Sequence, residues 1–491
     1  MDWTWLSLLE ADDYTIAREV LQRGVAAIYG LAFLSTYHQF PALLGERGLT
    51  PAPRFLARTR GRDAPTLFRL LPYGDRLLRT ICAVGMALAV AVIAGLSQLG
   101  PPWLPLLAFL AMWGLYLSIV NVGQRFYGFG WETLLLEAGF VVALLGSPEV
   151  APPLPILLFL RWLVFRLEFG AGMIKMRGDP AWRDLTAMDY HHQTQPMPNP
   201  LSRWAHRKPA WWHRAEALGS HAVQLVVPWL LFLPQPVASI AACLIILTQL
   251  YLVLTGNYAW LNWLTILLAF SAISDSFLRA LLGGPWEAAL AFPIELGDPR
   301  SPAWWTVLVA LVFLVLLGLS AAPLRNLCSK DQRMNASFNR LHLVNAYGAF
   351  GSMTKQRREL VIEGSIDPDP GEDDWRAYEF RGKPGDPRRM PRQFAPYHLH
   401  LDWLLWFAAL GRWREPWFNR LLEHLLEGDP AILRLLRTDP FEGRAPAVIR
   451  VRVFEYRFAS ARERRETGLW WLREELGTLL RARHSTRGTN T

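Results

Sequence analysis

Charged residues are scarce in this chain. They make up 19% of its 491 residues, whereas hydrophobic residues make up 52% and tryptophan occurs 23 times. So little charge leaves too few polar side chains to cover a water-soluble protein of this size, and abundant tryptophan suits a membrane–water boundary. The composition therefore argues against an ordinary soluble enzyme and favours an integral membrane protein whose first partner is the lipid bilayer.

Lysine is nearly missing as well. Only five of the 51 cations are lysine, and this arginine bias, with many Ala, Gly and Pro residues, is typical of a GC-rich bacterial genome, so we expect a bacterial inner membrane. The formal net charge is +9, yet the cations are spread over loops and tail, without a basic helix or RNA-binding motif. We therefore expect no nucleic-acid partner.

Cysteine and the common catalytic motifs are also rare. Three cysteines lie in or beside apolar stretches, and none follows Cys328, so no disulfide framework supports the C-terminal region. The sequence has no Gly-rich phosphate loop, Gly-x-Ser-x-Gly elbow or Cys-x-x-Cys pair. Five histidines lie between residues 191 and 221 without the His-x3-His spacing of a helical metal site. We expect no metal and no cofactor.

The first ten residues lack a basic residue, which argues against a cleavable signal peptide.

Long apolar runs fill the first two thirds of the chain. A hydrocarbon core about 30 Å thick needs roughly 20 helical residues to cross it. Seven runs approach this length, and the more polar Val25–Leu44 and Trp131–Leu145 are interpreted as helices that line the bundle. The seven are Thr80–Ser97, Trp103–Val120, Leu154–Ile174, His221–Leu233, Val237–Leu254, Trp260–Ile273 and Trp304–Ser320. We predict a polytopic α-helical membrane protein with about eight or nine transmembrane helices, since Pro234 and Pro236 could separate two spans or kink one.

The chain changes character after residue 321. Residues 358–364 and 449–458 alternate apolar and polar side chains as half-buried strands do. We predict an N-terminal segment 1–21, a transmembrane domain 22–321 with a long loop 176–220, an extramembrane α+β domain 322–481 containing a β-sandwich, and a disordered tail 482–491. Helices are expected at Leu401–Leu410 and Trp417–Leu426, and the domain is expected to rest on the membrane through Trp403, Trp406, Trp413 and Trp417.

Ionisable residues interrupt two of the apolar runs. Charges at membrane depth are costly unless they are paired or face water. We interpret Glu132, Glu137, Arg161, Arg166 and Glu168 as structural ion pairs, in which Glu132 or Glu137 pairs with Arg161 or Arg166. A proton or substrate site is the alternative.

The loop contains a proline-rich stretch, Pro196-Met-Pro-Asn-Pro200, which is extended and is expected to lie along a surface. The loop is either an interfacial segment of aromatic and basic residues or a docking surface for an extended partner.

The positive-inside rule places basic loops in the cytoplasm. Residues 45–79 hold eight arginines against three acids, and residues 176–218 hold six cations against four acids. Charge placement therefore puts this loop and the C-terminal domain on the cytoplasmic side.

Several long segments carry a family resemblance. Residues 169–200, from Phe-Gly-Ala-Gly-Met-Ile-Lys to Gln-Pro-Met-Pro-Asn-Pro, resemble the signature loop of lipase maturation factors. Residues 345–355, 378–387 and 395–407, followed by Asp439-Pro-Phe441 and Trp470-Trp471, resemble the C-terminal domain of that family. The resemblance implies a chaperone-like factor of the endoplasmic reticulum membrane in eukaryotic relatives, with lipases as clients. It also implies that loop and C-terminal domain face the lumen, against the charge count.

Part of the membrane region is also similar to the transmembrane domain of vitamin K-dependent carboxylases. The similarity lies in Ala171, Gly172, Lys175 and Trp182, which follow a span. It implies a membrane enzyme with Lys175 as base. Glu132, Glu137 or the loop histidines are the other candidates for the site of such an enzyme. A snorkelling interfacial lysine is the plainer interpretation, and a transporter is a third possibility.

Our preferred hypothesis is a maturation or folding factor for exported enzymes such as lipases, and more plausibly not an enzyme itself. The candidate client-binding residues belong to the loop and the C-terminal domain. They are Asp179, Trp182, Arg183, Asp184, Asp189, His191, Gln195, Pro196, Asn199, Tyr347, Tyr397, His398, Asp402 and Trp403.

Overall fold

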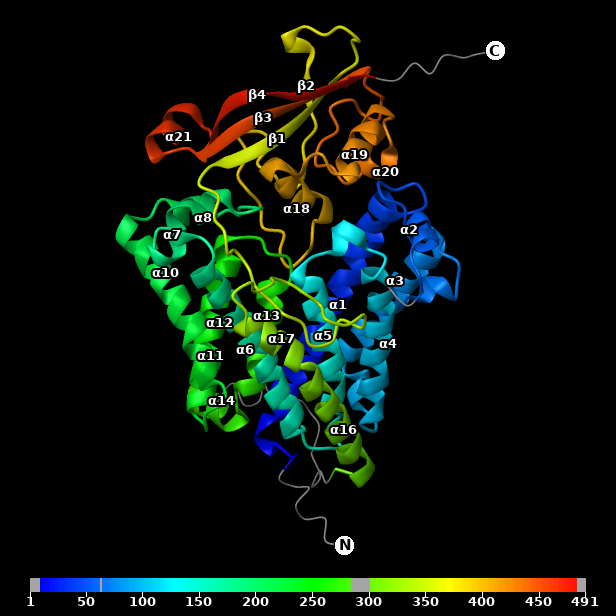
Figure 1. Ribbon diagram of the computed structural model, residues 1–491, viewed down its shortest axis with the longest axis vertical. Helices are drawn as coiled ribbons and strands as arrows, with labels where there is room; N and C mark the ends of the chain where they lie inside the picture. Colours follow the sequence, from blue (N-terminus) through cyan, green and yellow to red (C-terminus); the bar gives the residue numbers. More distant parts are fainter. Residues whose placement is uncertain (1–8, 62–63, 284–300, 484–491) are drawn as a thin grey trace.

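The computed structural model describes residues 9–61, 64–283 and 301–483, which form a long helical body with a small sheet at one end (Figure 1). The main helices of the body are α1 (Thr15–Leu44), α3 (Asp75–Ile93), α4 (Trp103–Val120), α5 (Gly130–Val142), α6 (Leu154–Arg177), α10 (Ala210–Leu225), α12 (Val237–Thr255), α13 (Leu261–Ala269) and α16 (Ala303–Leu319). Shorter helices are α2 (Ala52–Arg58), α7 (Pro180–Arg183), α8 (Met188–Thr194), α9 (Ser202–His206), α11 (Val227–Leu230), α14 (Asp275–Leu282) and α17 (Ala321–Cys328).

Prolines and polar residues set several helix ends. Pro236 precedes α12 and Pro302 precedes α16, where the missing N–H costs no intrahelical bond. Asp75 opens α3 with a carboxylate in the first turn, which suits the positive end of the helix dipole. The predicted span His221–Leu233 is not one separate helix. Its first residues belong to α10, which begins at Ala210 and ends before Pro228, and α11 follows.

Four helical stretches in the described residues are long and apolar enough to cross a membrane: α3, α4, α12 and the continuous α16–α17. A fifth is counted if α13 and α14, bent by 103°, form one broken span. The prediction of eight or nine crossings is therefore not confirmed. The helices α1 and α6 carry charged and polar side chains buried inside the bundle, which lowers their apolar character. With 13 residues, α5 is too short for a full crossing by itself.

The apolar helices form the outside of the body. Leu311, Leu314 and Val315 on α16 are each more than half exposed. Such exposed apolar faces are stable only against hydrocarbon or another apolar surface. The integral membrane class inferred from composition agrees with this arrangement.

The C-terminal domain has one antiparallel sheet in the order β2-β1-β3-β4. The strands are β1 (Arg357–Ser365), β2 (Arg376–Ala377), β3 (Val448–Phe458) and β4 (Trp471–Arg483), and the helices are α18 (His400–Phe407), α19 (Pro416–Leu426), α20 (Pro430–Leu433) and α21 (Ala461–Thr467). The predicted β-sandwich is wrong for the described residues, since α18 and α19 form the layer under the sheet (Figure 1). The predicted disordered tail lies, from residue 484 on, outside the described residues.

The domain sits directly on the loop 176–220. Arg357, at the start of β1, is buried and donates to the carbonyl oxygens of Gln193 at 2.9 Å and Pro196 at 3.2 Å. Arg203 in turn donates to the carbonyl oxygen of Ala459 at 2.8 Å. Loop and domain therefore share one end of the molecule, as both orientation arguments required.

Trp403 and Trp417 do not rest on the membrane surface. Both are 3% exposed, and they pack against Trp131 and Phe126 of the helical body. The aromatic residues thus join domain and bundle and leave no ring free to contact lipid at these two positions.

Candidate functional site

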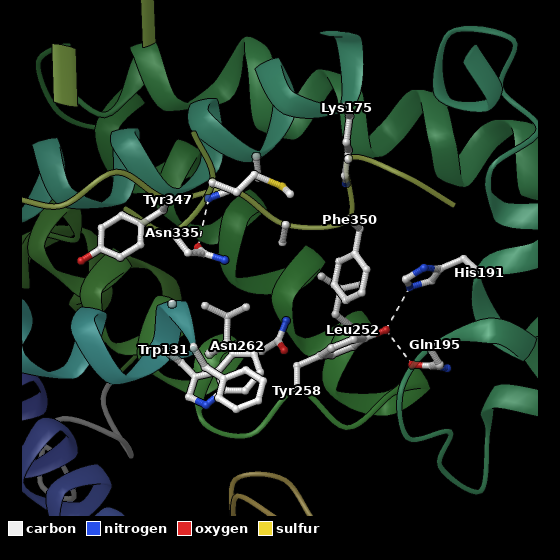
Figure 2. A pocket seen from close by; sticks show the side chains of 18 of the residues that line it. Trp131, Lys175, His191, Gln195, Leu252, Tyr258, Asn262, Asn335, Tyr347 and Phe350 are labelled. Atoms are coloured by element: carbon white, nitrogen blue, oxygen red, sulfur yellow. Dashed lines mark hydrogen bonds between the residues drawn. The ribbon is translucent and has the colours of Figure 1, made fainter. Parts of the chain in front are cut away.

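A cavity of about 1050 Å³ lies where the ends of α6, α10 and α12 meet the chain 347–354 and α18 (Figure 2). Apolar side chains form much of its wall. They include Val223, Leu247, Leu252, Leu261 and Phe350. A mostly apolar pocket with a few polar groups is the usual form of a binding site, so this cavity is the candidate functional site.

Lys175 is a buried cation of the cavity wall, which also includes Arg125 and Arg412. Its Nζ donates to Ser220 Oγ at 2.9 Å and lies 4.2 Å from the centre of the Trp182 ring. The same wall holds Glu168, which accepts a hydrogen bond from Gln249 at 2.6 Å. These groups would recognise a polar or anionic end of a mostly apolar ligand.

A chain of hydrogen bonds determines which ring nitrogen of His191 carries a proton. The hydroxyl of Tyr258 donates to Gln195 Oε1 at 2.6 Å, so it accepts from His191 Nε2 at 2.9 Å (Figure 2). His191 Nδ1 is buried without a hydrogen-bond partner, and burial, reinforced by His192, holds the pKa of His191 well below its usual range. A neutral imidazole therefore offers one lone pair in the cavity wall.

A buried ion pair ties the bundle to the chain that follows it. Glu137 on α5 pairs with Arg166 on α6, and both side chains are within 1% of full burial. Glu137 Oε2 also accepts from the backbone N–H of Asn345 at 2.8 Å and from the Tyr347 hydroxyl at 2.7 Å. Arg166 donates to the Asn345 carbonyl oxygen at 2.6 Å. The pair and its partners fasten residues 345–347 inside the helical body.

The other three charges of the predicted ion pairs have different partners. Arg161 donates to the carbonyl oxygens of Ser271 and Leu231 at 3.1 and 3.3 Å. Glu168 has Gln249 as its partner, and Glu132 lies beside two histidines. Hydrogen bonds to backbone carbonyls and neutral side chains thus satisfy buried charges that were expected to form ion pairs.

Glu132 on α5 meets His398 and His400 of the C-terminal domain. All three side chains are fully buried, and their possible ligand atoms lie within 4.8 Å of one another. In the part of the chain that the structure describes, these are the residues grouped closely enough to hold a metal ion.

Most of the predicted client-binding residues are not on a surface. Arg183 and Asp184 are exposed, and Asp179, Asp189 and Tyr397 are half-buried, whereas the other nine are buried. The proline-rich stretch is buried too, because Arg357 and Asn257 bind its carbonyl oxygens. The expectation that it lies along a surface is wrong. Five of the buried residues line the cavity, namely Trp182, His191, Gln195, Tyr347 and Trp403.

Asp179 and Asp402 accept hydrogen bonds from backbone N–H groups and so stabilise local chain structure. Asp179 caps α7 by accepting from the Ala181 N–H and also binds the Met353 N–H, and these bonds lower its pKa. Asp402 accepts from the Gly382 N–H at 2.6 Å, and burial raises its pKa to about 6.

The residues named for an alternative enzyme site come together only in part. Lys175 and the loop histidine His191 line the cavity, whereas neither Glu132 nor Glu137 belongs to its wall. The cavity residues Gln249, Tyr258 and Asn262 were not singled out from the sequence. The available signal was a polar side chain inside an apolar run, as at Gln249 and Asn262.

Two family models match the chain: the lipase maturation factor transmembrane domain over residues 16–280 and the lipase maturation factor C-terminal domain over residues 343–481. The chain is 39% identical to lipase maturation factor 1 of Mus musculus, covering 96% of this chain and 87% of that protein. It is 38% identical to the Homo sapiens protein of that name, over 96% and 88%. With lipase maturation factor 2 of Gallus gallus it shares 30% identity, over 94% and 80%. No solved structure matches. These matches confirm the resemblance seen in the sequence, and the chain belongs to the lipase maturation factor family.

Proposed function

We propose that this protein is a membrane-embedded maturation factor that helps exported lipases reach their active folded state. The observation that carries the proposal is the 38–39% identity, along 96% of the chain, to proteins named lipase maturation factor 1. The arrangement of the cavity supports it, because helices, loop and C-terminal domain build one wall together. Such a wall suits a scaffold that binds a partner.

The client would bind at the rim of the loop 176–220 with apolar groups entering the cavity behind it. Trp211 at the start of α10 is 65% exposed and Trp204 is 50% exposed. Arg183, the last residue of α7, and Asp184, which follows it, are exposed in the same loop. Exposed tryptophan and arginine are the residue types that dominate binding energy at protein interfaces.

We propose that eight or nine helices cross the bilayer, with α1, α5 and α6 as inner helices whose charged groups find hydrogen-bond partners within the protein. The membrane would be the inner membrane of a bacterium, and the endoplasmic reticulum in eukaryotic relatives. A reporter fused behind the C-terminus, active on one side of the membrane only, decides between the cytoplasmic side indicated by charge and the exoplasmic side implied by the family.

The deciding experiment is the activity per mass of secreted lipase in the native host, with and without this gene. Loss of the gene should leave lipase protein exported but with a collapsed specific activity. Trp211→Ala should reproduce part of that loss, whereas Trp304→Ala, an exposed tryptophan where α16 begins at the other end of the body, should not (Figure 1). Unchanged lipase mass and activity without the gene would refute the proposal.

A further inference from the structure

Three potential metal ligands meet at the contact between the bundle and the C-terminal domain. Glu132 Oε1 on α5 lies 2.9 Å from His398 Nδ1 and 3.6 Å from His400 Nε2. The two imidazole rings lie 3.8 Å apart between centres. All three side chains have no exposed surface, and the Nε2 atoms of both histidines lack a hydrogen-bond partner.

Ser35 on α1 determines where His400 carries its proton. Ser35 Oγ donates its one hydrogen to the His398 carbonyl oxygen at 2.8 Å and accepts one from Gln39 at 3.0 Å. The same oxygen lies 3.4 Å from His400 Nδ1. Since a hydroxyl oxygen keeps a second lone pair, His400 Nδ1 is the protonated nitrogen. His400 Nε2 therefore presents a lone pair toward Glu132.

His398 Nδ1 lies between an indole donor and a carboxylate. An indole N–H can only donate, and that of Trp131 lies 3.3 Å from His398 Nδ1, while Glu132 Oε1 lies 2.9 Å from the same nitrogen. The second carboxylate oxygen, Oε2, already accepts from the Tyr116 hydroxyl. Within the described residues, Glu132, His398 and His400 thus converge in a buried position, and each can offer one ligand atom.

The Nε2 atoms of both histidines are buried without a hydrogen-bond partner, which is costly in a dry interior unless another group satisfies them. We propose that Glu132, His398 and His400 bind a divalent transition-metal ion, zinc foremost. Two imidazoles and one carboxylate are an established donor set for such ions. Ligand bonds of about 2.0–2.2 Å bring donor atoms to separations close to those between Glu132 Oε1 and the two histidine nitrogens.

Two of the three groups have the further hydrogen bond that metal ligands usually make, whereas His398 Nε2 has no partner. Ligating histidines donate their other N–H to an oxygen, and ligating carboxylates accept a further hydrogen bond. Ser35 serves His400 in this way, and Tyr116 serves Glu132. Because the carboxylate comes from α5 and the imidazoles from the C-terminal domain, the ion would clamp that domain onto the bundle. The inference does not depend on the client of the proposed function.

The test is the metal content of the full chain, purified in detergent without a polyhistidine tag. Elemental analysis should find about one zinc per chain, and Glu132→Gln, His398→Gln and His400→Gln should each lower this about tenfold or more. His191→Gln is the matched control, because His191 is an equally buried histidine outside the cluster and should leave the metal content unchanged.

A second measurement uses the unaltered protein, so it does not depend on the variants folding. Chelation should lower the unfolding temperature and added Zn²⁺ should restore it, since an ion that binds only the folded state stabilises it. Cobalt loading should give the absorption bands of a low-coordinate site. If the unaltered chain holds no metal as purified and takes up neither Zn²⁺ nor Co²⁺, the proposal is overturned, and the Glu132 carboxyl carries a proton shared with His398.

Discussion

Removing the charge of Glu137 should destabilise the helical body by several kcal/mol. Glu137→Gln keeps an oxygen that accepts from Asn345 and Tyr347, but it leaves the Arg166 guanidinium without its counter-charge. Breaking a buried pair by removing one partner costs about 3–5 kcal/mol, because the remaining charge stays desolvated. Arg166→Met should cost a similar amount.

The double variant separates the pair from its surroundings. Because each single variant strands one charge, Glu137→Gln with Arg166→Met should be less costly than the sum of the two, with a coupling energy of about 2–3 kcal/mol. Unfolding in mixed detergent micelles, followed by tryptophan fluorescence, measures all four free energies. Tyr347→Phe is the matched control, since it removes one hydrogen bond to a charged group and should cost about 1.5–3 kcal/mol. Additivity of the two charge substitutions within about 0.5 kcal/mol would refute the reasoning.

Three further predictions concern the loop and its contacts. Gly178→Ala should lower the unfolding free energy by about 1–3 kcal/mol, because the added Cβ would lie 2.2 Å from a backbone oxygen of the chain that crosses it, whereas Gly219→Ala, with open space around it, should not. Burial lowers the pKa of His206 to about 4, so its contribution to stability is present above pH 6.5 and is lost as pH falls toward 4; His206→Phe should flatten the unfolding temperature over that range. Arg357→Met should free the loop carbonyls that Arg357 binds and raise amide hydrogen exchange in the neighbouring loop, and unchanged exchange would contradict that role.

Local patterns in the sequence predicted the elements whose boundaries depend on nearby residues. The predicted span Trp103–Val120 is α4 with the same ends, and the alternating residues 358–364 and 449–458 lie in β1 and β3. Strand β4 was not predicted, because its leucines at 472, 476 and 479 have a helical spacing. Pairing along β3 overrides that local pattern.

The candidate site was predicted less well than the fold. Glu137 and Arg166 were among the proposed pairs because they lie close in sequence on neighbouring runs. His398 and Glu132 are 266 residues apart, and no local period connects them. The proline-rich stretch is predicted to lie along a surface because it is extended rather than helical, yet Arg357, at a distant point of the chain, binds it in the interior.

The segment 345–347 also has a consequence for the order of biogenesis. Glu137 accepts hydrogen bonds from donors that lie 208 and 210 residues later in the chain. During synthesis α5 and α6 are therefore made before the groups that complete their polar interior. We expect truncation ahead of residue 345 to leave a bundle that membrane proteases degrade. The part of the chain that is made last thus supplies groups that complete the interior of the helical body.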